Sequence, residues 1–109
     1  MKITCHCGAL VVDQTDALPH KGHVIPDQDW HPVFDGIDLI IDDLVAGRSN
    51  AETACMKIRS IVGTASRFIY QCTHCGRLFV NDHHHQTREF VPATAATCKQ
   101  VLRSRDGNE

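Results

Sequence analysis

Two short cysteine motifs, one near each end of the chain, constrain this sequence more than any other feature. The first is Cys5-His6-Cys7-Gly8 and the second is Cys72-Thr73-His74-Cys75-Gly76. Two short turns that each offer a pair of thiolates build the tetrahedral set of soft ligands that Zn²⁺ prefers. The glycine that ends each motif can adopt a positive φ, which lets the chain fold back while amide groups point at the sulfurs. The predicted ligands of a structural zinc ion are Cys5, Cys7, Cys72 and Cys75.

Other uses of these cysteines fit the sequence less well. A redox C-x-x-C motif opens a helix, whose N-terminus lowers the pKa of the first thiol, but Cys75 is followed by the strand-like run Gly-Arg-Leu-Phe-Val. A disulfide within the first motif would close a very tight ring, and disulfides between the motifs would need an oxidising compartment. Because C-x-C is a less common spacing than C-x-x-C, His6 or His74 stays open as an alternative ligand, although both are expected to point outward.

Strand-like residues flank both motifs, at 1–4, 9–12, 67–71 and 77–80. A polar loop that contains His83, His84 and His85 follows, and residues 88–91 then form a third strand. We expect the three histidines to be an exposed loop, with a dedicated metal site as the less favoured alternative. The repeated pattern of strand, knuckle and strand resembles the rubredoxin-like zinc ribbon, in which two such knuckles face each other across one metal ion.

Residues 29–46 carry apolar side chains with a period near 3.6, which predicts an amphipathic helix. Asp29 is the expected cap, Pro32 is tolerable in the first turn only, and Gly47 closes the helix. Residues 17–26 contain two prolines and a glycine, and are expected to form a loop. The stripe expected to be buried comprises Trp30, Val33, Phe34, Ile37, Ile40, Ile41, Leu44 and Val45.

A capping box predicts a second helix: Ser49 and Glu52 can each satisfy an unpaired amide at its first turn, and Gly63 is expected to end it after Val62. The predicted fold class is therefore α+β: a small zinc ribbon of two β-knuckles plus a third strand, with a two-helix insertion between the knuckles. We expect one domain over residues 1–109, with the insertion at about 29–63 and a frayed tail at about 104–109.

The chain has 109 residues and six cysteines, two more than the predicted site needs. Cys55 and Cys98 are expected to be small buried apolar residues. The N-terminal region has no long apolar run, so we expect neither a secretion signal nor a membrane span. A cytoplasmic location follows as the expectation, since thiols stay reduced there and are free to bind zinc.

Negative charge is concentrated in one segment, because residues 27–47 contain six aspartates and no lysine or arginine. Asp35, Asp38 and Asp42 are three and four residues apart, so they share one exposed helix face. Like charges at these spacings oppose helix formation by a few tenths of a kcal/mol each. Either the face is simply solvated or it binds a basic protein partner. The hypothetical partner-binding residues are Trp30, Asp35, Asp38 and Asp42.

The sequence contains no recognisable catalytic constellation, and four sulfurs around zinc leave no open position for water, so we expect no enzymatic activity. Nucleic-acid binding is an alternative, because arginines alternate with aromatic residues in the C-terminal half. Against it, the aromatic residues are expected to be buried and the net charge is −2. The residues concerned are Arg67, Phe68, Tyr70, Arg77, Phe79, Arg88, Phe90, Arg103 and Arg105.

The runs at 11–16, 25–30 and 72–79 resemble those of small, poorly characterised bacterial proteins that pair a zinc ribbon with a helical insertion. Some of those proteins resemble the cognate immunity partners of secreted toxins. The resemblance spans most of the chain, and its specific part is the cysteine motifs. The resemblance implies a cytosolic protein that binds and neutralises a toxin. We therefore expect a non-catalytic protein-binding module that is stabilised by a structural zinc ion. The alternative is a zinc-ribbon protein that binds nucleic acid or takes part in transcription.

Overall fold

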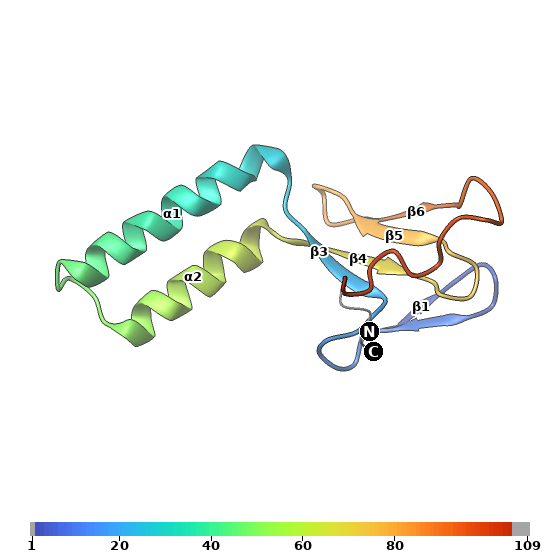
Figure 1. Ribbon diagram of the computed structural model, residues 1–109, viewed down its shortest axis with the longest axis horizontal. Helices are drawn as coiled ribbons and strands as arrows, with labels where there is room; N and C mark the ends of the chain where they lie inside the picture. Colours follow the sequence, from blue (N-terminus) through green and yellow to red (C-terminus); the bar gives the residue numbers. More distant parts are fainter. Residues whose placement is uncertain (1, 106–109) are drawn as a thin grey trace. The chain divides into compact units, whose positions relative to one another are not determined.

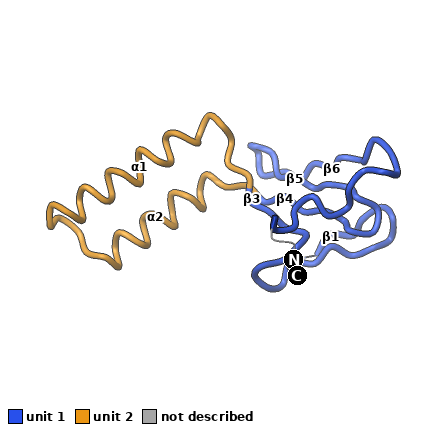
Figure 2. The backbone as a smooth tube through the Cα atoms, in the orientation of Figure 1, with its two compact units in different colours: residues 1–23, 68–109 blue, residues 24–67 orange. Residues whose placement is uncertain are grey.

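The computed structural model describes residues 2–105, which form an α+β fold with two helices and two small antiparallel sheets (Figure 1). The chain divides into two compact units: a β unit of residues 1–23 and 68–109, and a helical unit of residues 24–67 (Figure 2). Apart from Ser104 and Arg105, the tail predicted at 104–109 lies outside the described residues.

The β unit contains a two-stranded sheet and most of a four-stranded sheet. In the first, β1 (Lys2–Thr4) pairs antiparallel with β2 (Leu10–Val12), and Ile3 lies opposite Val11. In the second, β4 (Arg67–Gln71) pairs antiparallel with β5 (Leu78–Asn81), and β5 pairs antiparallel with β6 (Thr87–Phe90). The strands predicted beside the cysteine motifs and after the histidine loop are thus confirmed. The strand order of the second sheet is β3 (Lys21–Val24), β4, β5 and β6.

The strand β3 occupies part of the segment that the sequence predicted to be a loop, so that prediction was wrong there. The amide of Gln71 donates to the carbonyl of His20 at 2.8 Å, which joins this segment to β4. Glycine is tolerated because β3 is a short edge strand. At Gly22 it is also needed for packing, since an added Cβ would lie 3.0 Å from Cγ2 of Ile69 and 3.4 Å from Cδ2 of Leu102.

The core of the β unit is small and includes two of the cysteines. Its buried residues are Cys5, Val11, Tyr70, Cys72 and Phe79, and Ile3, Ala9 and Cys75 pack against them. Tyr70 and Phe79 lie opposite each other on β4 and β5, so their side chains share one face of the sheet. The cysteine motifs are therefore continuous with the apolar core.

The side chain of Gln71 fastens the C-terminal segment to the sheet. Residues 91–105 contain no helix or strand, and Gln71 is only 2% exposed. Its Nε2 donates to the carbonyls of Gly76 (3.2 Å) and Cys98 (3.0 Å), and its Oε1 accepts from the amide of Val101 (2.9 Å). One buried carboxamide thus satisfies three backbone groups that have no strand partner.

In the helical unit, α1 (Asp27–Val45) and α2 (Ala51–Ala65) lie side by side and run in opposite directions (Figure 1). The helix α1 begins two residues before the predicted cap Asp29, so Pro32 lies inside it rather than in the first turn. A proline here removes one hydrogen bond near the exposed helix start, which a long helix tolerates. Gly47 follows the C-cap with a φ of +79°, as its predicted role requires. No helix in the described part of the chain is long and apolar enough to cross a membrane.

The ends of α2 also differ from the prediction. Asn50, not Ser49, is the N-cap: its Oδ1 accepts from the amide of Thr53 at 2.9 Å. The two residue types are equally good caps, so sequence alone cannot choose between neighbours. The helix continues through Gly63 to Ala65, where the hydroxyl of Ser66 donates to the carbonyl of Val62. A glycine costs a helix about 1 kcal/mol relative to alanine, which is too little to end it.

Most of the stripe on α1 that was predicted to be buried is exposed. Only Val33 and Ile40 are buried, whereas the side chains of Trp30, Phe34 and Ile41 are 45%, 46% and 45% exposed. The stripe is wider than one neighbouring helix can cover. The prediction that Cys55 and Cys98 are buried was also wrong, because both are exposed.

Replacing Gln71 by leucine should loosen the C-terminal segment. Three backbone groups would lose their partner, at a cost of about 2–4 kcal/mol in unfolding free energy, because buried unsatisfied groups cost about 1–3 kcal/mol each and water reaches some of them. Denaturant unfolding and tryptic cleavage at Lys99 measure the effect. The exposed Gln14→Leu variant is the control, and equal stability of the two variants would contradict this role.

Tyr70 is the only tyrosine of the chain, so its ionisation can be followed by tyrosinate absorbance. Burial, together with its 2.6 Å hydrogen bond to Asp13, raises the pKa of Tyr70 to about 12. Because the unfolded value is about 10, this residue's contribution to stability is present below pH 10 and is lost as the pH rises toward 12. We expect Asp13→Asn to lower the titration midpoint. A wild-type midpoint near 10 in the folded protein would be the contrary result.

Candidate metal centre

The two cysteine motifs form similar turns. In the first, the amide of Gly8 donates to the carbonyl of Cys5 at 2.9 Å; in the second, the amide of Gly76 donates to the carbonyl of Cys72 at 2.7 Å. The φ angles of the two glycines are +95° and +90°. These values confirm the positive φ predicted for both, and other L residues rarely adopt them. Each turn thereby brings its two cysteines to the same side of the chain.

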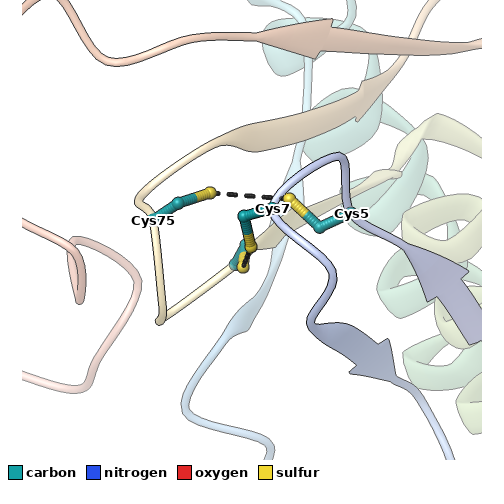
Figure 3. A group of neighbouring side chains, drawn as sticks. Cys5, Cys7 and Cys75 are labelled. Atoms are coloured by element: carbon teal, nitrogen blue, oxygen red, sulfur yellow. Dashed lines mark hydrogen bonds between the residues drawn. The ribbon is translucent and has the colours of Figure 1, made fainter.

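The four sulfurs of Cys5, Cys7, Cys72 and Cys75 converge, all within 4.8 Å of one another. Sγ of Cys5 lies 3.5 Å from Sγ of Cys75 (Figure 3), and Sγ of Cys7 lies 3.6 Å from Sγ of Cys72. A tetrahedral ion with bonds of about 2.3 Å separates its sulfur ligands by about 3.8 Å, whereas a disulfide needs about 2.05 Å. The cluster therefore has the dimensions of a metal site and not those of a pair of disulfides.

The histidines that were open as alternative ligands lie outside this set. His6 and His74 are both exposed, and Nδ1 of His6 lies 2.8 Å from Oε2 of Glu89. The turn after β5 exposes His83, His84 and His85, and no group of three metal-ligating residues other than the four cysteines occurs within residues 2–105. Four sulfurs complete a tetrahedral site without a nitrogen ligand.

A charged network, which sequence reasoning missed, surrounds one side of the cluster. Nη1 of Arg77 donates to Sγ of Cys75 at 3.3 Å, and Nε of Arg77 lies 3.0 Å from Oε2 of Glu89 on β6. The same oxygen of Glu89 contacts His6, so β6 connects the two cysteine motifs. The only signal in the sequence was Arg77, which directly follows the glycine of the second cysteine motif. Nothing in the sequence indicated that Glu89 would contact Arg77.

The surroundings shift the pKa values of the two neighbouring thiols, Cys5 and Cys75, in opposite directions. Burial raises the pKa of Cys5 to about 12. Burial also opposes ionisation of Cys75, but hydrogen bonds from the backbone and side chain of Arg77 outweigh it and lower that pKa to about 6. The lowered pKa favours the thiolate form of Cys75, which is the form that binds metals. A cation that displaces the remaining protons would be held by four sulfurs, with no open position for water.

The residues predicted to bind a partner are separate from this centre in the sequence and lie on α1. Asp35, Asp38 and Asp42 are exposed, and Trp30 is half exposed. The aromatic residues of the alternative nucleic-acid surface were expected to be buried, and that was wrong for Phe68 and Phe90, which are 39% and 56% exposed. Tyr70 and Phe79 are buried, and Arg77 and Arg88 form ion pairs, Arg88 with Asp82 at 2.8 Å.

A family model described as "Domain of unknown function (DUF8617)" matches residues 1–94 of the chain. The matched span includes both cysteine motifs and both helices. No curated protein and no solved structure matches the sequence.

Replacing a ligand should remove the metal and destabilise the β unit. We expect Cys72→Ser to lower the bound metal, measured by elemental analysis, from one ion per chain to well under half, and to lower the thermal midpoint. Cys98→Ser is the matched control, since Cys98 is exposed and outside the cluster. Adding a chelator to the unchanged protein should have the same effect as Cys72→Ser. Equal metal content in the two variants would exclude Cys72 as a ligand.

Proposed function

The chain belongs to the DUF8617 family of domains of unknown function, and we propose that it is a non-catalytic, zinc-stabilised module that binds a basic protein partner. The observation that carries the proposal is an exposed row of aspartates on α1, none of which forms an ion pair within the described residues. The metal centre supplies the stability of the module and takes no part in binding.

Zn²⁺ suits the donor set, because four thiolates at tetrahedral spacing are its usual structural ligands. The proposed architecture is a zinc ribbon in which the helical unit is inserted between the two knuckles. Closing a loop of the length between Cys7 and Cys72 costs about 4 kcal/mol. Structural zinc contributes about 10–16 kcal/mol in small zinc-finger peptides. The metal therefore outweighs the closure cost of a long insertion.

The proposed absence of catalysis follows from the same site. A catalytic zinc keeps a coordination position for water or substrate, and a set of four sulfurs fills every position of a tetrahedral ion. The candidate centre is thus suited to holding the fold together rather than to activating water.

The acidic row, defined as Asp35, Asp38 and Asp42, supports protein binding. All three residues are exposed, and within the described residues none of them forms an ion pair. Because like charges at these spacings destabilise a helix, such a row has a cost that a basic partner would offset. When two binding surfaces carry opposite electrostatic potentials, the association rate and the specificity of binding increase more than the affinity does.

The proposed partner is a toxin domain with a basic surface, and the chain would be its cytosolic immunity protein. The support is the resemblance of residues 11–16, 25–30 and 72–79 to proteins of this kind, together with the acidic row. Neutralisation would then consist of masking the basic surface, which requires no chemistry from the module.

Reversing the acidic row should weaken partner binding without affecting the metal centre. Proteins captured by the tagged chain from its host are identified, and the affinity of the purified partner is measured by calorimetry. We expect the Asp35→Lys/Asp38→Lys/Asp42→Lys variant to bind at least about tenfold more weakly, or about 1.4 kcal/mol. Metal content and helical circular dichroism should stay unchanged. Asp16→Lys/Glu52→Lys is the control, because it reverses exposed acids outside the row.

Two outcomes would overturn the proposal. One is an affinity that the reversal leaves unchanged. The other is capture of nucleic acid instead of protein, with binding that falls steeply with salt and that Arg67→Ala/Arg88→Ala reduces.

A further inference from the structure

A second apolar stripe on α1 lies beside the seam between the two helices. It consists of Trp30, Phe34, Ile37, Ile41 and Leu44, at successive spacings of four, three, four and three residues. The seam itself is formed by Val33 and Ile40, which are buried. The second stripe is only partly covered: Ile37 is half-buried, and Trp30, Phe34 and Ile41 keep almost half of their surface exposed.

The helix α2 carries a stripe with the same spacing. Its members are Ala51, Cys55, Ile58, Val62 and Ala65. Ala54 is buried in the seam, and Ile61 faces α1, because a Cβ added to Gly36 would lie 3.0 Å from its Cδ1.

The two stripes lie on the same side of the helical hairpin. On α1, Phe34 and Ile41 each follow a seam residue by one position, and on α2, Cys55 and Val62 do the same. One residue is a turn of about 100° around a helix. Because the helices run in opposite directions, that turn points toward the same side in both (Figure 1).

A helix with two adjacent apolar stripes is typical of a four-helix bundle, where each helix packs against two neighbours. In the helical unit each helix has only one neighbour. We propose that two copies of this chain pair through the bundle face, meaning the two stripes together, to form a closed four-helix bundle.

The sizes of the side chains specify how the copies pair. The stripe on α1 is dominated by large residues such as Trp30 and Phe34, whereas that on α2 includes the small residues Ala51 and Cys55. Close packing requires large side chains to meet small ones. A two-fold axis that places α1 of each copy on α2 of the other satisfies this requirement at both contacts.

Charge favours the same pairing. The helix α1 has six aspartates and no basic residue, whereas α2 has one acidic residue, Glu52, against Lys57 and Arg59. Pairing α1 with α1 would bring two acidic rows together, whereas α1 against α2 opposes charges of different sign. The dimer would also bury Phe34, Ile41 and Cys55, which the sequence predicts to be buried and which are exposed in the single chain.

The dimer does not depend on the proposed function. It would cover Trp30 and leave the outer side of the acidic row at the rim of the bundle. A basic partner would then be held by the aspartates, and Trp30 would belong to the contact between copies.

Sedimentation equilibrium of the metal-loaded 109-residue chain tests the proposal. We expect a mass twice that of the 12.1 kDa chain at micromolar concentration. Ile41→Asp should shift the protein to the monomer, with a dissociation constant raised at least 100-fold. Leu39→Asp is the matched control: Leu39 is 66% exposed on α1 but is outside the stripe, so this variant should remain dimeric. Unchanged helical circular dichroism in both variants excludes misfolding.

Trp30 provides a second measurement, because it is the only tryptophan in the chain. Its emission should shift to shorter wavelength as dilute protein is concentrated, and Ile41→Asp should abolish that shift. A monomeric mass at every concentration would overturn the proposal, even if a basic protein bound the bundle face. An assembly that keeps growing with concentration would also overturn it, because the proposed pairing is closed.

Discussion

The convergence of four sulfurs is the interaction on which the rest of the structure depends. Two of the cysteines, Cys5 and Cys72, are also members of the small core of the β unit, so a metal ion bound by the cluster would be coupled to formation of that core. The network through Arg77 and Glu89 adds β6 to the same centre. With so few buried residues, the apolar contacts of this unit alone are a weak basis for stability, and a structural metal ion is one of the supplements that small units of this kind use.

Tethering at the centre also explains how the chain accommodates a helical unit between its two motifs. The helices α1 and α2 bury their own apolar residues, Val33, Ile40 and Ala54, and form a separate compact unit. The rest of the chain therefore has only to hold the two ends of this unit. Within that unit, the side chains that face away from the seam are not needed for packing between the helices. They can therefore be charged or apolar residues that bind other molecules. The acidic row and the bundle face are adjacent on α1, so one helix presents two chemically different surfaces.

Much of this arrangement could be predicted from local rules. The glycines of the two motifs, the strands beside them and the existence of both helices all follow from short-range patterns, and all were confirmed. The exceptions depend on long-range contacts. The strand β3 forms because β4 offers it an edge, and the network from Cys75 to Glu89 joins residues that are distant in sequence. Periodicity identified the apolar side of α1, but it could not show that α2 covers only half of it.

X-ray absorption spectroscopy of the purified protein is the most direct test of the central claim. We predict one zinc ion per chain, bound by four sulfurs at about 2.3 Å, with no nitrogen or oxygen among its ligands. A protein that folds without metal, or a metal whose ligands include water or histidine, would contradict it.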